Sequence, residues 1–161
     1  MSTPEAARHS RPRGELRLTV ALWLAVVATM VPLLRVVSSG TWLPGAALLA
    51  AVLLGVGFGL RRRRRMPAVA VTLAEFVVWA LAITAAFLPE TSFLRVIPTG
   101  GVVEAVPSLV QEAAGEILEG VAPLAPTVAL SFVIVAALGL LTIALDHVVL
   151  TARMPLLAAV A

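Results

Sequence analysis

Residues 43–88 read LPGAALLAAVLLGVGFGLRRRRRMPAVAVTLAEFVVWALAITAAFL, and this stretch decides the fold. Two apolar runs flank five consecutive arginines, and each run is close to the roughly 20 residues that a helix needs to cross a bilayer. Five arginines are costly to translocate, so the short connection that contains them is predicted to be cytoplasmic. The stretch therefore predicts two membrane-spanning helices, at about 43–60 and 67–88.

Two further apolar runs, at about 16–37 and 128–150, flank this hairpin. Pro32 is expected to kink the first of them near its far end. A signal peptide is the rival interpretation of that run, but the run is longer than a signal-peptide core and Arg35 lies where cleavage would occur. Another apolar run opens at Pro155, so we expect a fifth helix to start at 155–161 and to continue beyond Ala161. The predicted fold class is an all-α membrane protein, a polytopic bundle with four complete transmembrane helices.

The composition agrees with lipid as the solvent. Hydrophobic residues make up 60% of the 161 residues and charged residues 13%, against about 25% charged residues in soluble domains. All basic residues are arginines and most flank apolar runs, so we interpret them as topology signals and expect no nucleic-acid partner. The chain has no cysteine and two histidines, so no disulfide, metal site or cofactor is predicted. No catalytic motif is present either, which excludes an enzyme within these residues.

The distribution of arginine predicts the orientation. With four spans, the arginines at 8, 11, 13, 17, 61–65 and 153 lie on one side of the membrane, and Arg35 and Arg95 lie on the other. The arginine-rich side is expected to be cytoplasmic, which places the N-terminus inside the cell. Residues 1–15 are polar and are expected to be a disordered cytoplasmic tail, followed by a helical membrane domain over 16–161.

The long outer loop, residues 89–127, contains one more helical pattern. Apolar residues recur at 106, 109, 110, 113, 114, 117, 118 and 121, at the spacing of an amphipathic helix. Ser108 and Gln111 form a capping box after Pro107, and Gly120 is a natural stop. We expect an extracytoplasmic helix over about 109–119, either on the outer membrane surface and the end of the bundle or as a docking surface for an extracytoplasmic domain.

Three sets of residues are candidates for a specific role. Glu75, Asp146 and His147 are ionisable groups inside or next to predicted spans, where charge is costly. We expect Glu75 and Asp146 either to pair with a basic residue, such as Arg153 or one of Arg61–Arg65, or to stay protonated. The run Arg61, Arg62, Arg63, Arg64 and Arg65 is expected to set topology and to contact lipid headgroups. Gly55 and Gly59 form a G-x-x-x-G spacing, which is typical of close helix packing.

A set of landmarks resembles one family. These are Phe87-Leu88-Pro89, Phe93-Leu94, Ile97-Pro98-Thr99, Gly120-Val121-Ala122-Pro123 and the run from Leu145-Asp146-His147 through Arg153-Met154-Pro155 to Leu157. From about residue 16 to its end, the chain is similar to the N-terminal membrane region of TgpA-type transglutaminase-like proteins in their actinobacterial form. The resemblance implies several N-terminal membrane helices in a bacterial plasma membrane, then a large extracytoplasmic domain with a cysteine–histidine–aspartate triad, and then a final helix. It also implies a MoxR-type ATPase and a von Willebrand-like protein as genetic neighbours.

The chain departs from this pattern in two ways. It contains no cysteine, so no triad can be placed on it, and His147 stands where an apolar residue is expected. The leading interpretation is a non-catalytic membrane-anchoring region that orients an extracytoplasmic catalytic domain outside these residues. Two alternatives stay open: a small stand-alone transporter or channel subunit that uses Glu75 and Asp146, and an assembly subunit that packs on other membrane proteins.

Overall fold

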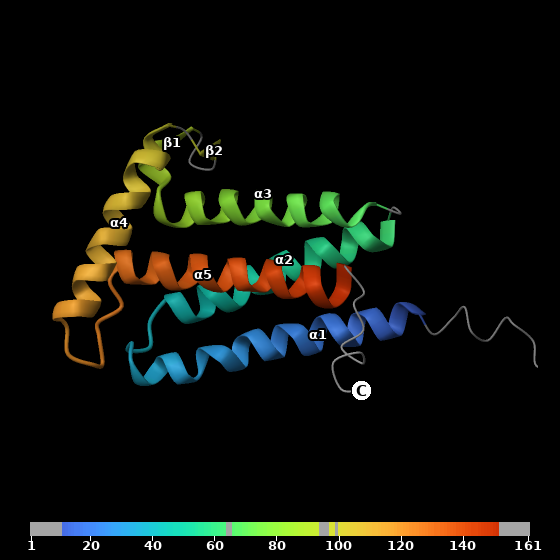
Figure 1. Ribbon diagram of the computed structural model, residues 1–161, viewed down its shortest axis with the longest axis horizontal. Coiled ribbons are helices and arrows are strands. Elements are labelled where there is room, and N and C mark those ends of the chain that lie inside the picture. The colour runs from blue at the N-terminus through green and yellow to red at the C-terminus, as the bar shows by residue number, and fades with distance from the viewer. Residues whose placement is uncertain (1–10, 64–65, 94–96, 99, 152–161) are drawn as a thin grey trace, which may run out of the picture.

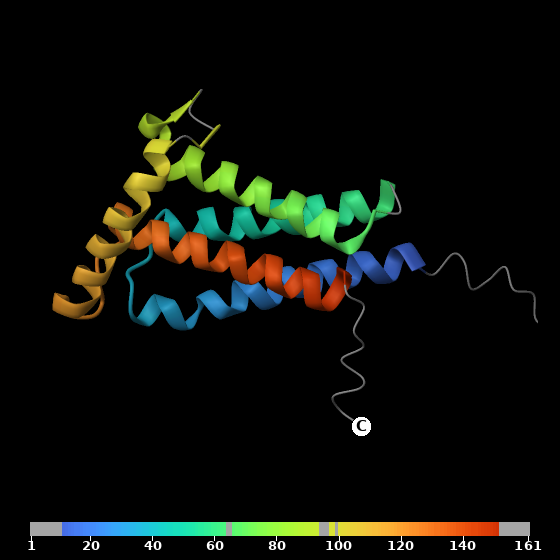
Figure 2. The same ribbon diagram turned by 45° about the horizontal axis from the view of Figure 1, so that its top comes forward.

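Four long helices run side by side in this protein and a fifth crosses one end of them (Figure 1). The structure, a computed structural model, describes residues 11–63, 66–93, 97–98 and 100–151. The lengthwise helices are α1 (Arg11–Met30), α2 (Trp42–Arg63), α3 (Ala68–Phe87) and α5 (Val128–Asp146). Helix α4 (Gly100–Glu119) lies across the end at which α3 finishes and α5 begins, and the view after a 45° turn shows the same arrangement (Figure 2).

The lengthwise helices have the dimensions and surface of membrane spans. Four segments of the described chain are long and apolar enough to cross a membrane: Gly14–Arg35, Trp42–Arg62, Ala68–Phe87 and Val128–Val149. At 1.5 Å per residue, 20 residues reach about 30 Å, the thickness of the hydrocarbon layer. Large apolar side chains such as Leu48, Val69 and Leu73 are exposed on the outside of the bundle, where lipid would cover them. The predicted all-α helical bundle is thus confirmed.

The first span differs from its predicted outline at both ends. Helix α1 begins at Arg11, so residues 11–15 are helical rather than part of the expected tail. It ends at Met30, and Pro32–Arg35 form a separate 3₁₀ turn, η1, instead of a kinked continuation. Pro32 has no N–H to donate to the preceding turn, which is why the α-helical ladder stops before it.

Helix α2 extends into the arginine run. It ends at Arg63, so Arg61, Arg62 and Arg63 are helical rather than part of a loop. Pro67 precedes the first turn of α3, where a missing N–H costs nothing. Arg64, Arg65, Arg153, residues 1–10 of the predicted tail and the predicted start of a fifth helix at 155–161 lie outside the described residues.

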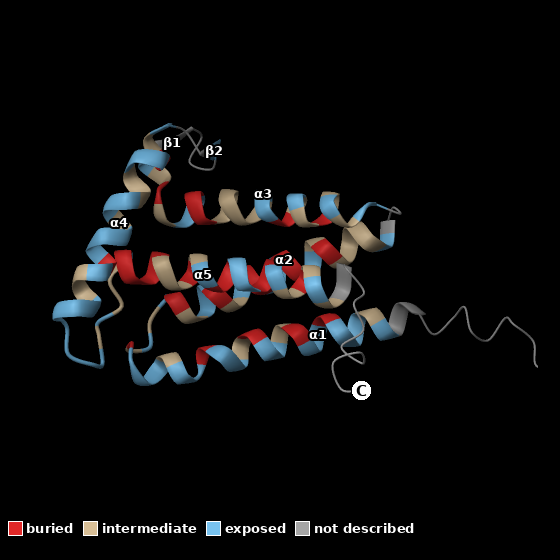
Figure 3. Ribbon diagram, viewed as in Figure 1, coloured by how far each residue is buried: buried red, intermediate tan, exposed pale blue. Residues whose placement is uncertain are grey.

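Helix α5 is the centre of the bundle. It contacts α1, α2, α3 and α4, and it has more buried residues than any other helix that the structure describes (Figure 3). Two indole groups tie helices together across this core. Trp23 Nε1 donates to the Ala47 carbonyl of α2 at 3.0 Å, and Trp79 Nε1 donates to the Ala136 carbonyl of α5 at 3.1 Å. After α5 the chain continues as one π-helical turn, η3 (His147–Thr151), where the predicted span ran unbroken to 150.

Helix α4 is longer than the predicted helix at 109–119. It starts at Gly100 and passes through Pro107, so the predicted capping box is wrong: Ser108 lies mid-helix and its Oγ donates to the Ala105 carbonyl at 2.7 Å. Packing explains the longer helix, because Val102 is buried against the bundle and holds the first turn in place. The carbonyl that Pro107 leaves without a helical donor belongs to Val103, whose side chain is exposed, so water can reach this turn.

The loops at this end of the bundle, which we call the α4 end, are paired with one another. Val36 and Ser38 exchange backbone hydrogen bonds with Leu124, at 2.8 and 2.9 Å. After the short turn η2 (Pro89–Thr91), β1 (Ser92–Phe93) pairs antiparallel with β2 (Ile97–Pro98). The opposite end, which carries Arg61 and Asp146, is called the arginine end below.

Candidate functional site

Three charged side chains meet inside the bundle at the arginine end. Arg61 comes from the last turns of α2, Glu75 from the second turn of α3 and Asp146 from the last residue of α5. Apolar residues dominate all three helices. A cluster of charges in such surroundings is the feature of this chain that calls for an explanation beyond packing.

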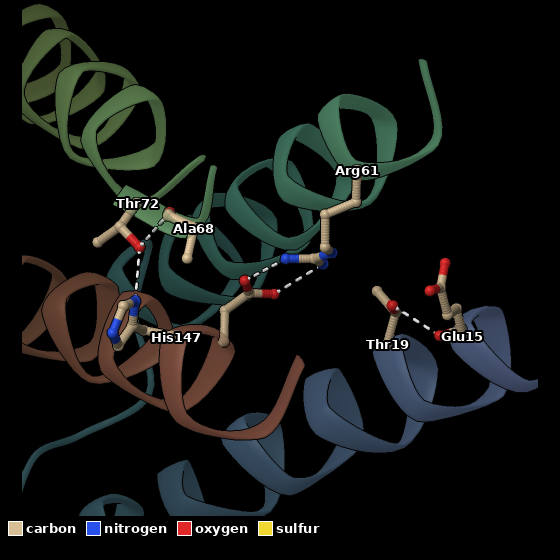
Figure 4. Close-up of polar contacts among 7 residues, drawn as sticks. Glu15, Thr19, Arg61, Ala68, Thr72 and His147 are labelled. Carbon is tan, nitrogen blue, oxygen red and sulfur yellow. Dashed lines mark hydrogen bonds and ion pairs between the residues drawn. The ribbon is translucent and has the colours of Figure 1, made fainter. Parts of the chain in front are cut away.

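Arg61 and Asp146 form a two-point ion pair. Arg61 Nη1 donates to Asp146 Oδ2 at 2.5 Å and Nη2 donates to Oδ1 at 3.0 Å (Figure 4). The side chain of Asp146 is 1% exposed and that of Arg61 is 14% exposed. Parallel guanidinium–carboxylate bonds are the strongest form of ion pair in proteins. The pair joins the ends of α2 and α5, and Arg61 is one of the partners that the sequence predicts for Asp146.

Glu75 is buried more completely and is less well satisfied. Its side chain is 0% exposed, and neither carboxyl oxygen meets hydrogen-bond geometry with the residues that the structure describes. Asp146 and Arg61 are the charged neighbours that act on it. Arg61, one of the partners that the sequence predicts for Glu75, is therefore nearby. The hydrogen bonds of Arg61, however, go to Asp146.

Gly57 provides the space for this carboxyl group. A Cβ atom built on Gly57 would collide with Glu75 Oε1 and would lie 3.1 Å from Arg61 Nη1. By contrast, a Cβ at Gly55 or Gly59 would meet nothing within 4 Å. Among the described residues, the glycine of α2 that α3 approaches closely is therefore Gly57, and not Gly55 or Gly59 of the G-x-x-x-G pair.

A second polar contact lies beside the cluster. Thr72 Oγ1 and His147 Nδ1 are 2.8 Å apart, and Thr72 Oγ1 also donates to the Ala68 carbonyl at 3.3 Å (Figure 4). The Thr72 hydroxyl has a single proton, which it donates to the Ala68 carbonyl. In the contact between Thr72 and His147, Nδ1–H of His147 is therefore the donor and Thr72 Oγ1 the acceptor. The contact joins α3 to the π-turn after α5, so His147 holds the two helices together.

The spacing of residues could have revealed part of this cluster. Gly57 and Arg61 are four residues apart on α2, and Thr72 and Glu75 are three apart on α3, so each pair shares a helix face. The sequence does not predict the contact between Trp79 and Gly139, where a Cβ on Gly139 would lie 2.5 Å from Trp79 Cδ1. No one-dimensional pattern marks that contact, because it depends on how α3 crosses α5.

The chemistry open to the cluster is limited. The described residues contain no group of three or more metal-ligating side chains, and the chain has no cysteine. Two carboxyl groups and one guanidinium can hold helices together and can hold a proton. A cavity of about 410 Å³ lies elsewhere, near the α4 end between α2, α3 and α5, and its lining is mostly apolar, with Trp42, Leu49, Ile83, Phe87 and Val135 among its residues.

The comparisons with known proteins give one match. The family model of the TgpA N-terminal domain matches residues 24–161, which include α2 to α5 whole and about the last two turns of α1. No curated protein and no solved structure matches significantly. The matched region contains the charge cluster, three of the four spans whole and the second half of the first span. This multi-pass membrane chain therefore belongs to the TgpA N-terminal domain family.

Proposed function

We propose that these residues form a non-catalytic membrane anchor that orients an extracytoplasmic transglutaminase-like domain of the same protein. The observation that carries the proposal is the match of an N-terminal domain family to residues 24–161, which hold three of the four spans whole and the second half of the first. The sequence adds that these residues carry no catalytic motif and no cysteine nucleophile. The partners expected of such an anchor are the lipid bilayer, the extracytoplasmic domain and neighbouring membrane subunits.

The proposed orientation places the arginine end in the cytoplasm of a bacterial cell. The start of α1, with Arg11, Arg13 and Arg17, lies at the same end as Arg61 and Arg62 of α2, whereas Arg35 lies at the α4 end (Figure 1). Positive residues near the ends of spans are retained on the cytoplasmic side. The α4 end then faces outward, toward the proposed catalytic domain.

Helix α4 supports this orientation because it presents three different faces. Val102, Leu109 and Ala113 face the bundle. At 100° per residue, a second apolar face follows, and its members Val103, Val110, Ile117 and Leu118 are exposed. The remaining face carries Glu104, Glu112 and Glu119, which are exposed as well. We propose that the second face rests in the outer headgroup region while the acidic face meets water and the catalytic domain.

The transporter alternative receives less support. A transport role for Glu75 and Asp146 would require that these groups face a water-filled path. They are buried instead, and the cavity between α2, α3 and α5 lies in the other half of the bundle. The cavity lining includes the hydroxyl residues Thr41 and Ser131 and no charged residue among those described.

Reading the gene beyond codon 161 tests the anchor proposal. We expect the open frame to continue through at least one more apolar helix into a polar domain that contains cysteine, histidine and aspartate in that order. A stop codon directly after codon 161 would contradict the proposal, and so would a following domain that lacks these three residues.

A further inference from the structure

We propose that Glu75 and Asp146 form a binding site for one proton, which the two carboxyl groups share beside Arg61. The proposal concerns the arginine end of the bundle and does not depend on which domain follows the anchor. It starts from a count of charges. Among the side chains that the structure describes, two carboxyl groups are buried together with one guanidinium, so full ionisation of these three groups would give them a net charge of −1.

An uncompensated charge is not stable at this place. Glu75 is surrounded by protein on all sides, at 0% exposure, within a helix whose outer face meets lipid. No water-exposed edge of the carboxyl group is available to lower the cost of its charge. Either a second cation or a proton must therefore accompany Glu75.

The side chains around the pair do not supply a second cation. Within the described part of the chain, the charged and titratable groups on the elements packed there are Glu15 and Arg17 of α1, Arg61 and Arg62 of α2, and His147 of η3. Arg17 and Arg62 are exposed, and His147, which contacts Thr72 through Nδ1, makes no hydrogen bond to Glu75. Arg61 uses both terminal nitrogens on Asp146. Among the side chains that the structure describes, the cation beside Glu75 is therefore Arg61, and its hydrogen bonds go to Asp146.

A metal ion fits this place less well than a proton does. Hard cations take about six or more oxygen ligands, with space between them. Here the carboxyl group of Glu75 lies against the α2 backbone at Gly57, where even a methyl group has no room. A proton needs no coordination shell. It converts one carboxylate into a carboxylic acid, whose O–H can then donate to the other carboxylate.

Infrared spectroscopy of the full-length protein in lipid nanodiscs tests the proposal. At neutral pH, the wild-type spectrum minus that of Glu75→Gln should show the C=O stretch of one protonated carboxylic acid, shifted downward after exchange into D₂O. The matched control is Glu104→Gln, which changes an exposed carboxylate of α4 and should leave that band in place. Because glutamine has the shape of the neutral acid, Glu75→Gln is expected to fold like the wild type.

Asp146→Asn separates a shared proton from one that Glu75 holds alone. With a neutral residue at 146, the charge of Arg61 is expected to compensate an ionised Glu75, so the acid band should be lost. Persistence of the band in Asp146→Asn would overturn the shared site. Absence of the band from the wild type would overturn the proton site altogether. The proton site would also be overturned if the wild type were more stable in sodium chloride than in choline chloride and Glu75→Gln were not. That result would assign the site to a metal cation.

Discussion

Gly57 of α2 lies directly against the carboxyl group of Glu75 of α3, and a β-carbon at this position would overlap Glu75 Oε1. The relationship sets how closely α2 and α3 approach at the arginine end. It also explains how a fully buried acid fits between two helices that otherwise pack through apolar side chains. Small residues allow such close approach in membrane bundles.

Gly57→Ala is expected to destabilise the bundle by about 1–3 kcal/mol, the usual cost of overpacking a core. The carboxyl group that the new methyl group would meet is fully buried. Titration with SDS in mixed micelles, followed by circular dichroism, measures the change in the free energy of unfolding. Gly55→Ala is the matched control and should be close to neutral, because its new methyl group meets nothing within 4 Å. Equal losses for the two variants would show that Gly57 is not a special position.

Arg61→Ala should be far more harmful than Arg62→Ala. Removing Arg61 leaves Asp146 buried without its cation, which typically costs about 3–5 kcal/mol, whereas the exposed Arg62 should contribute less than about 0.5 kcal/mol. Arg61→Lys should recover only part of the loss, because an ammonium group cannot make the two parallel bonds. The same SDS titration gives the three values. A loss for Arg62→Ala as large as that for Arg61→Ala would mean that net charge, not the ion pair, is responsible.

Gly139→Ala is expected to disturb the contact between α3 and α5. Its methyl group would lie 2.5 Å from Trp79 Cδ1 and 3.0 Å from Leu49 Cδ2, and it would push the indole away from the Ala136 carbonyl. We expect a loss of about 1–3 kcal/mol and a shift in tryptophan fluorescence. Gly45→Ala, where a methyl group meets nothing within 4 Å, is the control. An unchanged spectrum and unchanged stability in Gly139→Ala would argue against this helix crossing.

Thr72→Val should remove the bond to His147 and weaken the junction between α3 and η3 by about 1 kcal/mol. Thr29→Val serves as its control, because the Thr29 hydroxyl is exposed and donates within its own helix, to the Val26 carbonyl. That control should fall within about 0.5 kcal/mol of the wild type. If both variants lose the same amount, the effect comes from the helix and not from the contact with His147.

The membrane helices could be predicted from the sequence because their signal is one-dimensional. A run of about 20 apolar residues has few other solutions in lipid, and so the spans at 43–60 and 67–88 agree with α2 and α3 to within a few residues. The start of α4 could not be predicted in the same way. Pro107, Ser108 and Gln111 form a local start signal, and the burial of Val102 against the bundle overrides it.

The charge cluster was predictable only in part. Burial of Glu75 and Asp146 follows from their place in apolar helices, and an arginine partner follows from the cost of a buried charge. Which arginine pairs with Asp146 depends on the rotation of α2 about its axis. That rotation turns Gly57 and Arg61 toward α3 and α5, and it leaves Gly55 without a neighbour.

The most direct test of the anchor is the side of the membrane on which its two ends lie. These 161 residues contain no cysteine. With any cysteine that follows them replaced by serine, single cysteines can be placed at Glu119, exposed on α4, and at Arg62, exposed at the arginine end. Intact cells are treated with a membrane-impermeant maleimide, and a second sample is treated after lysis. We predict that Glu119→Cys is labelled in intact cells and that Arg62→Cys is labelled only after lysis. The reverse pattern would place the arginine end outside and would contradict an anchor that presents α4 to an extracytoplasmic domain.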